Sequence, residues 1–266
     1  MRSSQRKTAL VTGATRGIGY ELSKLFAQNG YDLVINARHL EDLEEVAAEF
    51  EESFGISVHP IARDLSDPDT PEALFEEVGA NSLSVDVLVN NAGFGLRGTF
   101  AETDMETELR MMRVNMVALT HLTKLFLGGM LERGSGWILN VASTAAYMPG
   151  PLMCVYYATK AYVLSFTEAL ASELEGSGVG VTVLCPGPTK SQFKKRAKQR
   201  EIWLRYLLRE MAPERVARAG FRAVERGRRL ALPGLQDWLV VFFHRFVPRP
   251  LLANLVHELH KRREVD

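Results

Sequence analysis

The chain has 266 residues, of which 46% are apolar, 24% charged and 9% aromatic. That composition supplies core material for one large or two small globular domains, and it excludes disordered, collagen-like and low-complexity proteins. The 32 basic and 32 acidic residues cancel and give no reason to expect a nucleic-acid partner, although residues 190–266 alone hold 19 Lys or Arg against 8 Asp or Glu.

Short aliphatic or β-branched runs alternate with amphipathic, helix-length segments along the chain. This alternation predicts an α/β fold of the doubly wound Rossmann type, a parallel sheet with helices on both faces. Helices are expected between the strands, among them 17–30, 39–53, 105–130 and 154–176. No linker divides the pattern, so we expect one domain over 1–266. The seven strands are expected at residues 8–12, 32–37, 57–61, 85–90, 137–142, 180–185 and 229–232.

The pattern changes after residue 232, where the core over 8–232 is expected to end. Residues 233–247 are apolar nearly all round. The next segment, 248–263, carries apolar residues at positions 251, 252, 255, 256 and 259, which is the spacing of one helix face. The sequence therefore predicts a helical extension over 233–266.

The first strand leads into the glycine-rich sequence TGATRGIG at 12–19, which opens a helix. Glycines at 13, 17 and 19 allow the backbone to approach a pyrophosphate, whose charge meets backbone amides and the positive end of the helix dipole. A loop that needs glycine only for its conformation gives the same pattern, and isolated glycine motifs often match by chance. The position between the first strand and a helix favours a dinucleotide cofactor.

The end of the second strand distinguishes the two nicotinamide dinucleotides. An acidic residue there accepts hydrogen bonds from the ribose of NAD, whereas a cation suits the 2′-phosphate of NADP. Here the strand ends in Asn36-Ala37-Arg38, and Arg16 in the glycine turn offers a second guanidinium. Ordinary exposed arginines are the alternative. Together with the missing acid, the two arginines predict NADP.

Several separated motifs resemble the short-chain dehydrogenase/reductase superfamily, in its branch of about 250 residues with TGxxxGxG and YxxxK motifs. The resemblance covers about 8–232 and names no substrate. Besides TGATRGIG, the motifs are Asp64-Leu65, NNAG at 90–93, Asn115, Ser143, Tyr156-x-x-x-Lys160 and PGPT at 186–189.

The resemblance implies which residues hold the cofactor. Asp64 would contact the adenine, residues 90–93 would form a wall beside the cofactor, and Thr189 would hold the nicotinamide carboxamide. The cofactor-binding residues implied in this way are Gly13, Thr15, Arg16, Gly17, Ile18, Gly19, Arg38, Asp64, Leu65, Asn91, Ala92, Gly93, Tyr156, Lys160, Pro186, Gly187 and Thr189.

The catalytic residues are expected to be Asn115, Ser143, Tyr156 and Lys160. Tyr156 and Lys160 lie four apart in a helical stretch, so their side chains share one face. A nearby ammonium favours the phenolate of a tyrosine and lowers its pKa from about 10, which makes Tyr156 a usable acid or base. Ser143 can donate a hydrogen bond to the substrate oxygen. By resemblance, Asn115 supports Lys160 through a water and relays protons.

Each of these residues also has an ordinary structural explanation. A Tyr and a Lys four apart occur by chance in many helices, a Ser after a strand is a common cap, and an Asn can bond locally. Only Tyr156, and not Tyr157, has Lys at +4. The joint occurrence predicts an NADPH-dependent oxidoreductase acting on a carbonyl or alcohol. The alternative is a catalytically silent cofactor-binding sensor or interaction protein with the same fold.

Other chemistry-bearing residues point to no further centre. The six histidines form no i, i+4 pair and no cluster with carboxylates, so we expect no metal. Cys154 has no activating partner and is expected to line the pocket. The acidic residues at 41–52 are expected to form a solvated helix face.

The cysteine count and the absence of a signal sequence indicate the expected location. Two cysteines are too few for a disulfide framework, which indicates a reducing compartment. The N-terminus has no secretory apolar run, and the most apolar window, 235–247, is too short and interrupted to span a membrane. We therefore expect a cytoplasmic protein, soluble or peripheral to the membrane.

Assembly and the basic C-terminal quarter give two further expectations. The helices around Asn115 and Tyr156 carry apolar residues on more than one face, and relatives pair these helices, which implies a homodimer or homotetramer; a thicker monomeric core is the alternative. The run at 190–200 and the extension suit a lipophilic substrate, a phosphate or acyl carrier, or an anionic membrane surface. Alternatively, the extension packs on the sheet edge or a neighbouring subunit. The residues named for assembly are Leu119, Leu122, Phe126, Val163, Phe166 and Leu170.

Overall fold

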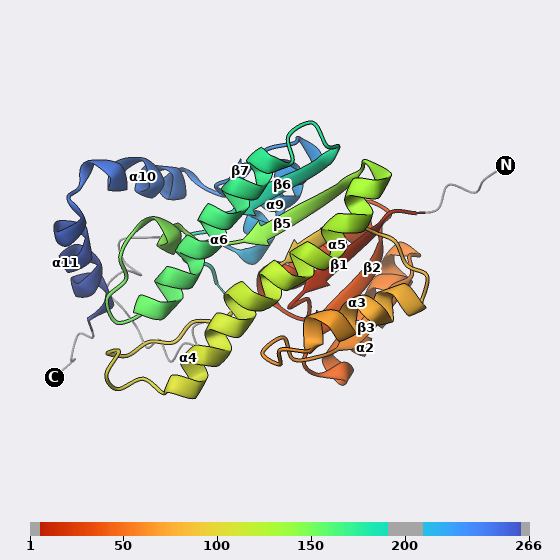
Figure 1. Cartoon of the computed structure of the whole chain (residues 1–266), viewed down its shortest axis with the longest axis horizontal. Helices are drawn as coiled ribbons and strands as arrows, with labels where there is room; N and C mark the ends of the chain where they lie inside the picture. The colour runs from red at the N-terminus through yellow and green to blue at the C-terminus, as the bar shows by residue number, and fades with distance from the viewer. Residues whose placement is uncertain (1–5, 191–209, 262–266) are drawn as a thin grey trace.

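The computed structural model describes residues 6–190 and 210–261 (Figure 1). Its seven strands form one parallel sheet in the order β3-β2-β1-β4-β5-β6-β7. Every strand end lies within one residue of its predicted position, so the predicted α/β fold is confirmed. The strands are β1 (Thr8–Thr12), β2 (Asp32–Ala37), β3 (Val58–Ala62), β4 (Val85–Asn90), β5 (Gly136–Val141), β6 (Val179–Leu184) and β7 (Leu230–Ala231).

The strand order reverses between β1 and β4, which pair side by side although β2 and β3 lie between them in the chain. In an open parallel sheet this arrangement leaves a crevice beyond the carboxyl ends of the two strands, where ligands bind. The helices of the core are α1 (Gly17–Gln28), α2 (Leu40–Phe54), α3 (Thr70–Ala80), α4 (Met105–Met112), α5 (Leu119–Arg133), α6 (Cys154–Glu173) and α9 (Pro213–Glu225).

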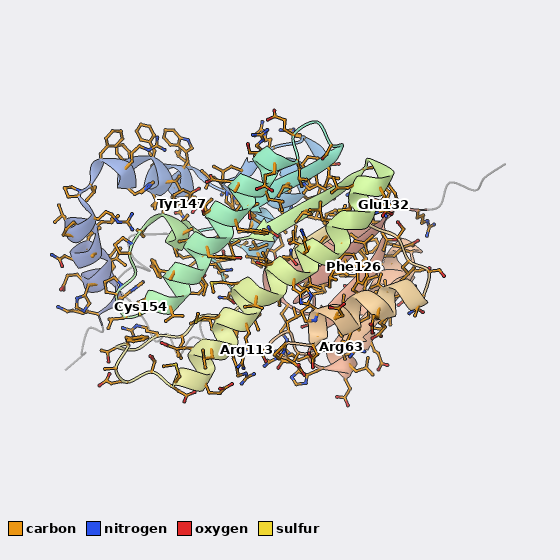
Figure 2. All side chains as sticks on the ribbon, viewed as in Figure 1. Arg63, Arg113, Phe126, Glu132, Tyr147 and Cys154 are labelled. Carbon is orange, nitrogen blue, oxygen red and sulfur yellow. The ribbon has the colours of Figure 1, made fainter. Side chains whose placement is uncertain are left out.

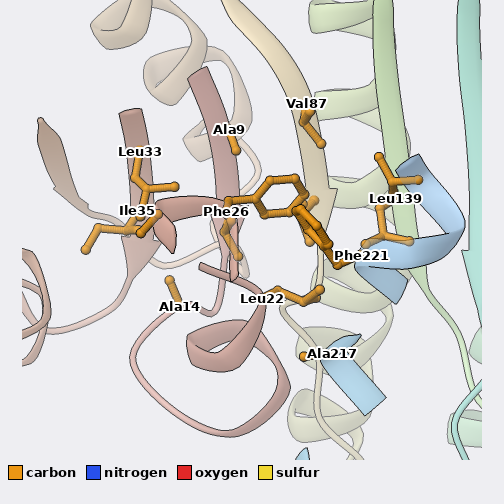
Figure 3. Close-up of a cluster of buried hydrophobic side chains, with 14 of the residues drawn as sticks. Ala9, Ala14, Leu22, Phe26, Leu33, Ile35, Val87, Leu139, Ala217 and Phe221 are labelled. Atoms are coloured by element: carbon orange, nitrogen blue, oxygen red, sulfur yellow. The ribbon is translucent and has the colours of Figure 1, made fainter. Parts of the chain in front are cut away.

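The core lies in two layers, one on each face of the sheet. On one face, α1, α2 and α9 bury an apolar cluster in which the Phe26 and Phe221 rings meet edge to face, 5.0 Å apart (Figure 3). On the other face, α3, α5 and α6 cover the sheet with side chains such as Leu74 and Leu122 (Figure 1). Helices thus bury both faces, which is why the strands are almost wholly apolar.

The predicted helix over 105–130 runs from Met105 to Arg133 but is not uniform. Between α4 and α5 it contains a π-helical segment, η1 (Arg113–Ala118), which includes Asn115. By length and composition alone this helix could cross a membrane, and 44% of its most apolar window is buried. The core helix of a soluble protein passes the same test. Here Leu122, Phe126 and Met130 pack against the sheet.

The predicted helical extension is confirmed as a pair of helices, α10 (Leu235–Phe243) and α11 (Arg249–His260), joined by a short 3-10 turn, η3 (His244–Phe246). We call residues 233–261 the C-terminal arm; it lies at one end of the molecule (Figure 1). Of the apolar residues with helical spacing, Leu252 and Val256 are buried, but Leu251 and Leu255 are more than half exposed. The single-domain organisation stays a prediction.

Candidate active site

A cavity of about 910 Å³ runs past the carboxyl ends of the strands into the space beside the arm. Nearly all of the sequence-predicted site residues share it, although they come from segments far apart in the chain. Gly19 and Asn115 do not line it. The predicted residues that do are Gly13, Thr15, Arg16, Gly17, Ile18, Arg38, Asp64, Leu65, Asn91, Ala92, Gly93, Ser143, Tyr156, Lys160, Pro186, Gly187 and Thr189.

The conformation of the glycine turn allows a ligand to approach the protein backbone closely. Gly13 and Gly17 have φ of +66° and +60°, a conformation that favours glycine. At Gly19 a Cβ atom would lie 2.2 Å from the carbonyl oxygen of Gly13. The side chain of Arg16, the N-cap residue of α1, does not cap the first amides of the helix, which face the end of the cavity lined by Gly17 and Ile18. These features fit the pyrophosphate of a dinucleotide.

Beyond the tip of β2, Arg38 and Asp64 line the same end of the cavity. Burial alone would raise the pKa of Asp64, but hydrogen bonds from the Ser66 amide and hydroxyl and the charges of Arg38 and Arg110 together lower it. The carboxylate is therefore charged and fixed in place. This geometry suits a hydrogen-bond acceptor beside an adenine amine.

Arg16 in the glycine turn forms an ion pair with Asp42. Its Nη2 lies 3.2 Å from Oδ2 of Asp42, at the start of α2, and Asp42 itself lines the cavity. Asp42 remains partly exposed, as expected for the acidic residues at 41–52, but it also lines the cavity because α2 begins right beside the glycine turn. Since a carboxylate already engages Arg16, Arg38 is the better placed of the two predicted cations to recognise a phosphate.

Ser143 and Tyr156 meet at the centre of the cavity. Tyr156, in the first turn of α6, is 9% exposed and hydrogen-bonded to the Ser143 side chain. Ser143 precedes a 3-10 turn, η2 (Thr144–Tyr147), and its Oγ accepts from the Ala145 amide at 3.1 Å and donates to the Pro186 carbonyl at 3.3 Å. The serine is thereby held between the phenol and the PGPT motif.

Lys160 lies one turn further along α6, as its spacing from Tyr156 predicts. It is 5% exposed; its Nζ donates to the Val141 carbonyl at 2.8 Å and lies 6.0 Å from the centre of the Tyr156 ring. Burial lowers the pKa of Lys160 to about 8, so the ammonium form still predominates at pH 7.

The pKa of Tyr156 differs from the sequence-based expectation. Burial raises it to about 12, although the hydrogen bond with Ser143 acts in the opposite direction. The expected lowering by Lys160 is therefore wrong for the protein alone, because desolvation outweighs a charge whose hydrogen bond points to Val141. The neutral phenol is the resting form, ready to donate a proton.

Asn115 lies behind the cavity wall rather than in it. Its Oδ1 accepts from the Phe94 amide at 3.1 Å, and its Nδ2 donates to the Phe94 carbonyl at 2.9 Å and to Thr159 Oγ1 at 3.0 Å. A Cβ atom built on Gly93 would lie 3.0 Å from Asn115 Oδ1 and 3.5 Å from Lys160 Nζ, so both polar groups border this glycine. The π-helical segment thus fixes the loop after β4 beside Lys160.

The structure adds residues that sequence reasoning missed, and they come from the arm. Asp237 is buried, and the amides of Gly234 and Gly187 donate to its carboxylate; burial raises its pKa to about 6. His260, 3% exposed, contacts Tyr157 and lines the cavity. The available signal for Asp237 was a carboxylate beside the apolar run at 238–243, because a charged residue buried there requires a partner.

Two other expectations have different outcomes. Cys154 is exposed at the start of α6 and does not line the cavity, so its predicted place in the pocket is wrong (Figure 2). The basic run at 190–200 lies outside the described residues except for Lys190. Within 6–190 and 210–261, no group of three His, Cys, Asp or Glu side chains could hold a metal ion.

Comparison with known proteins identifies relatives in sequence and in fold. The sequence model described as "short chain dehydrogenase" matches residues 7–202. The probable oxidoreductase EphD of Mycobacterium tuberculosis is 32% identical over 259 residues, which cover 92% of this chain but only 44% of that relative.

Two solved structures share the fold over nearly the whole chain. A short-chain dehydrogenase from Sphingobium yanoikuyae in complex with NADPH is 28% identical, covers 98% of both chains and has a TM-score of 0.81. A short-chain dehydrogenase/reductase from Burkholderia phymatum in complex with NAD is 26% identical, covers 91% of this chain and 94% of its own, and has a TM-score of 0.80. With the matched family and the motifs gathered around one cavity, the chain belongs to the short-chain dehydrogenase family of oxidoreductases.

Proposed function

We propose that this protein is an NADPH-dependent carbonyl reductase, reversible in principle, acting on a small-molecule ketone or secondary alcohol. The observation that carries the proposal is the contact of Ser143 with Tyr156, with Lys160 one turn away. These residues line the cavity between the glycine turn at one end and the apolar residues of the arm at the other. Structural neighbours bind NADPH or NAD, which supports a nicotinamide cofactor at the end with the glycine turn.

Ser143, Tyr156 and Lys160 each have a separate role in the proposed reaction. When bound, the nicotinamide supplies a hydride to the carbonyl carbon, or accepts it in the reverse direction. The Ser143 hydroxyl donates a hydrogen bond to the carbonyl oxygen as negative charge develops there. Tyr156 transfers its hydroxyl proton to that oxygen to complete the alcohol, and the Lys160 ammonium stabilises the phenolate left behind until solvent reprotonates it. Asn115 positions Lys160 through the loop after β4.

The remaining lining residues hold the cofactor. The turn formed by Gly13, Gly17 and Gly19 takes the pyrophosphate, Asp64 and Leu65 take the adenine, and the PGPT motif at 186–189 takes the nicotinamide end. A catalytically silent sensor would not need Ser143, Tyr156 and Lys160 together in one buried cluster. A screen of ketones and alcohols that follows NADPH oxidation or NADP reduction tests the proposal, and turnover of none of them would favour the sensor.

We predict that Arg38→Asp lowers the preference for NADPH over NADH by about tenfold or more, because a charge-assisted contact to the 2′-phosphate is replaced by repulsion. The ratio of the two dissociation constants, measured by titration calorimetry, checks this. Arg113→Asp is the matched control, since Arg113 is paired with Glu106 and does not line the cavity. An unchanged ratio in Arg38→Asp would assign cofactor choice to other residues.

We also propose a homodimer or homotetramer. Most residues named for this from the sequence, including Leu122 and Val163, are buried within the chain itself and do not support it. The exposed large apolar side chains on the same helices are instead Met105, Leu109, Val117, Leu131 and Tyr162. Light scattering is expected to give a dimer or tetramer mass that Val117→Glu reduces; a monomeric wild-type protein would exclude this assembly.

Contact of the arm with an anionic membrane surface, in an otherwise cytoplasmic protein, stays a prediction. Trp238, Phe246 and Leu251 are exposed beside the exposed cations Arg245 and Arg249, a combination suited to anionic headgroups. The protein is expected to sediment with phosphatidylglycerol vesicles at low salt and not with phosphatidylcholine vesicles. Failure to sediment with either would remove membrane contact from the proposal.

A further inference from the structure

The part of the cavity beyond Tyr156 is lined by the C-terminal arm and is largely apolar, which none of the sequence motifs indicates. Apart from His244 and His260, every side chain that the arm contributes to the cavity is apolar. These side chains come from both α10 and α11, so the apolar wall extends over two helices. They include Val240, Phe243, Val247, Leu252, Leu255 and Leu259.

The two histidines in this wall are engaged with the protein. His260 Nδ1 lies 2.9 Å from the Pro151 carbonyl, so this nitrogen donates and Nε2, 3.2 Å from Tyr157 Oη, accepts from the phenol. His244 Nδ1 lies 2.6 Å from the Val241 carbonyl. A neutral His260 imidazole that accepts from Tyr157 adds no fixed charge to this part of the cavity, and His244 is bonded to its own helix.

The arm is fastened to the catalytic elements near both of its ends. Near the start of α10, Asp237 accepts from the Gly234 amide at 3.0 Å and from the amide of Gly187, which belongs to the PGPT motif. At the end of α11, Arg97 donates to the carbonyl of His260, whose ring reaches the segment that precedes α6. The arm is thus held in place as a wall of the site.

Building on the proposed carbonyl reductase activity, we propose that the substrate is an uncharged ketone or secondary alcohol with a large hydrocarbon group. Its oxygen lies at Ser143 and Tyr156, and its hydrocarbon group lies against the arm. Removing each methylene from water is worth about fourfold in affinity. A carboxylate buried there would lose its hydration without a Lys or Arg partner among the described lining residues of the arm.

A series of methyl ketones tests this inference. We expect kcat/KM with NADPH to rise about fourfold per methylene from 2-butanone to 2-octanone and then to level off as the cavity fills. The charged analogue 4-oxopentanoate is expected to react at least about tenfold more slowly than 2-pentanone, which has the same number of carbons. Equal kcat/KM along the series, or a faster reaction of the acid, would overturn the inference.

Two leucines in adjacent turns of α11 provide a matched pair of variants. Leu255 and Leu251 are 56% and 57% exposed, so neither is part of the core, but only Leu255 lines the cavity. Leu255→Asp is expected to lower kcat/KM for 2-octanone about tenfold, with that for 2-butanone and the NADPH dissociation constant unchanged. Leu251→Asp is expected to behave as wild type. Equal effects of the two substitutions would mean that the arm does not contact substrate.

A binding measurement separates this inference from the reductase proposal. Addition of 2-octanone to the NADPH complex is expected to raise the melting temperature of the wild type and of Leu251→Asp but not of Leu255→Asp. If that pattern appears without turnover of any ketone, the proposed reaction fails while the apolar site stands. If short ketones are reduced but 2-octanone gives no shift, the apolar site fails while the reaction stands.

Discussion

The Tyr156→Phe variant is expected to lose turnover of every carbonyl substrate by a factor of about 10² to 10⁴, the range that a positioned proton donor contributes. Phenylalanine fills the same buried volume but cannot transfer a proton or hydrogen-bond to Ser143. Because Tyr156 is not part of the glycine turn, NADPH should bind with nearly the wild-type dissociation constant. Steady-state kinetics and calorimetric titration on the same preparation measure the two effects.

Tyr162→Phe is the control for this prediction. Tyr162 lies in the same helix, is 39% exposed, and bonds through its hydroxyl to Thr120 Oγ1 at 2.8 Å, away from the cavity. Its replacement should leave kcat/KM within about twofold of wild type, because phenylalanine keeps the ring at the proposed subunit contact and the lost hydroxyl does not line the cavity. Turnover retained in Tyr156→Phe would show that another group supplies the proton and would remove the reaction assignment.

The Gly19→Ala variant is expected to weaken NADPH binding by about 10- to 100-fold. A methyl group at this position would lie 2.2 Å from the Gly13 carbonyl oxygen and 2.4 Å from Asn91 Nδ2, so the turn itself must move. Displacement of a packed backbone of this kind costs about 1 to 3 kcal/mol, and every 1.4 kcal/mol is a factor of ten. Calorimetric titration with NADPH measures the loss.

Gly128→Ala separates this steric effect from the general effect of alanine in a helix. Gly128 lies in α5, and a Cβ atom there would meet nothing within 4 Å. This substitution should leave NADPH binding unchanged and stabilise the protein slightly, because alanine favours the helix over glycine by about 0.5 to 1 kcal/mol. Wild-type affinity in Gly19→Ala would show that the turn does not hold the pyrophosphate.

The strands and the meeting of the motifs could be predicted from sequence for a physical reason. A strand buried on both faces appears as a short apolar run, such as residues 87–89 within β4, which Asp86 and Asn90 flank. Residues that follow such strands converge because the carboxyl ends of parallel strands share one edge of the sheet. Ser143 after β5 therefore meets both Tyr156 and Pro186 of the PGPT motif after β6.

The contacts that adjust this site could not be predicted in the same way. The ion pair of Arg16 with Asp42 and the contact of Tyr157 with His260 join residues 26 and 103 positions apart. Neither pair has a spacing pattern, since the partners meet only because separate elements pack together. The pKa of Tyr156 is of this kind too: the spacing to Lys160 predicts a lowered value, but burial by the surrounding fold raises it.

The sequence by itself determined the α/β class, the strand positions, the glycine turn and the spacing of Tyr156 and Lys160, because each depends on local pattern or on the geometry of one helix. Tertiary structure alone decided which sides of α10 and α11 are buried and that the arm walls the cavity. A helical period defines a face but not its partner. Where the arm lies depends on the bonds of Asp237 to the Gly187 amide and of His260 to the Pro151 carbonyl, which exist only in the folded chain.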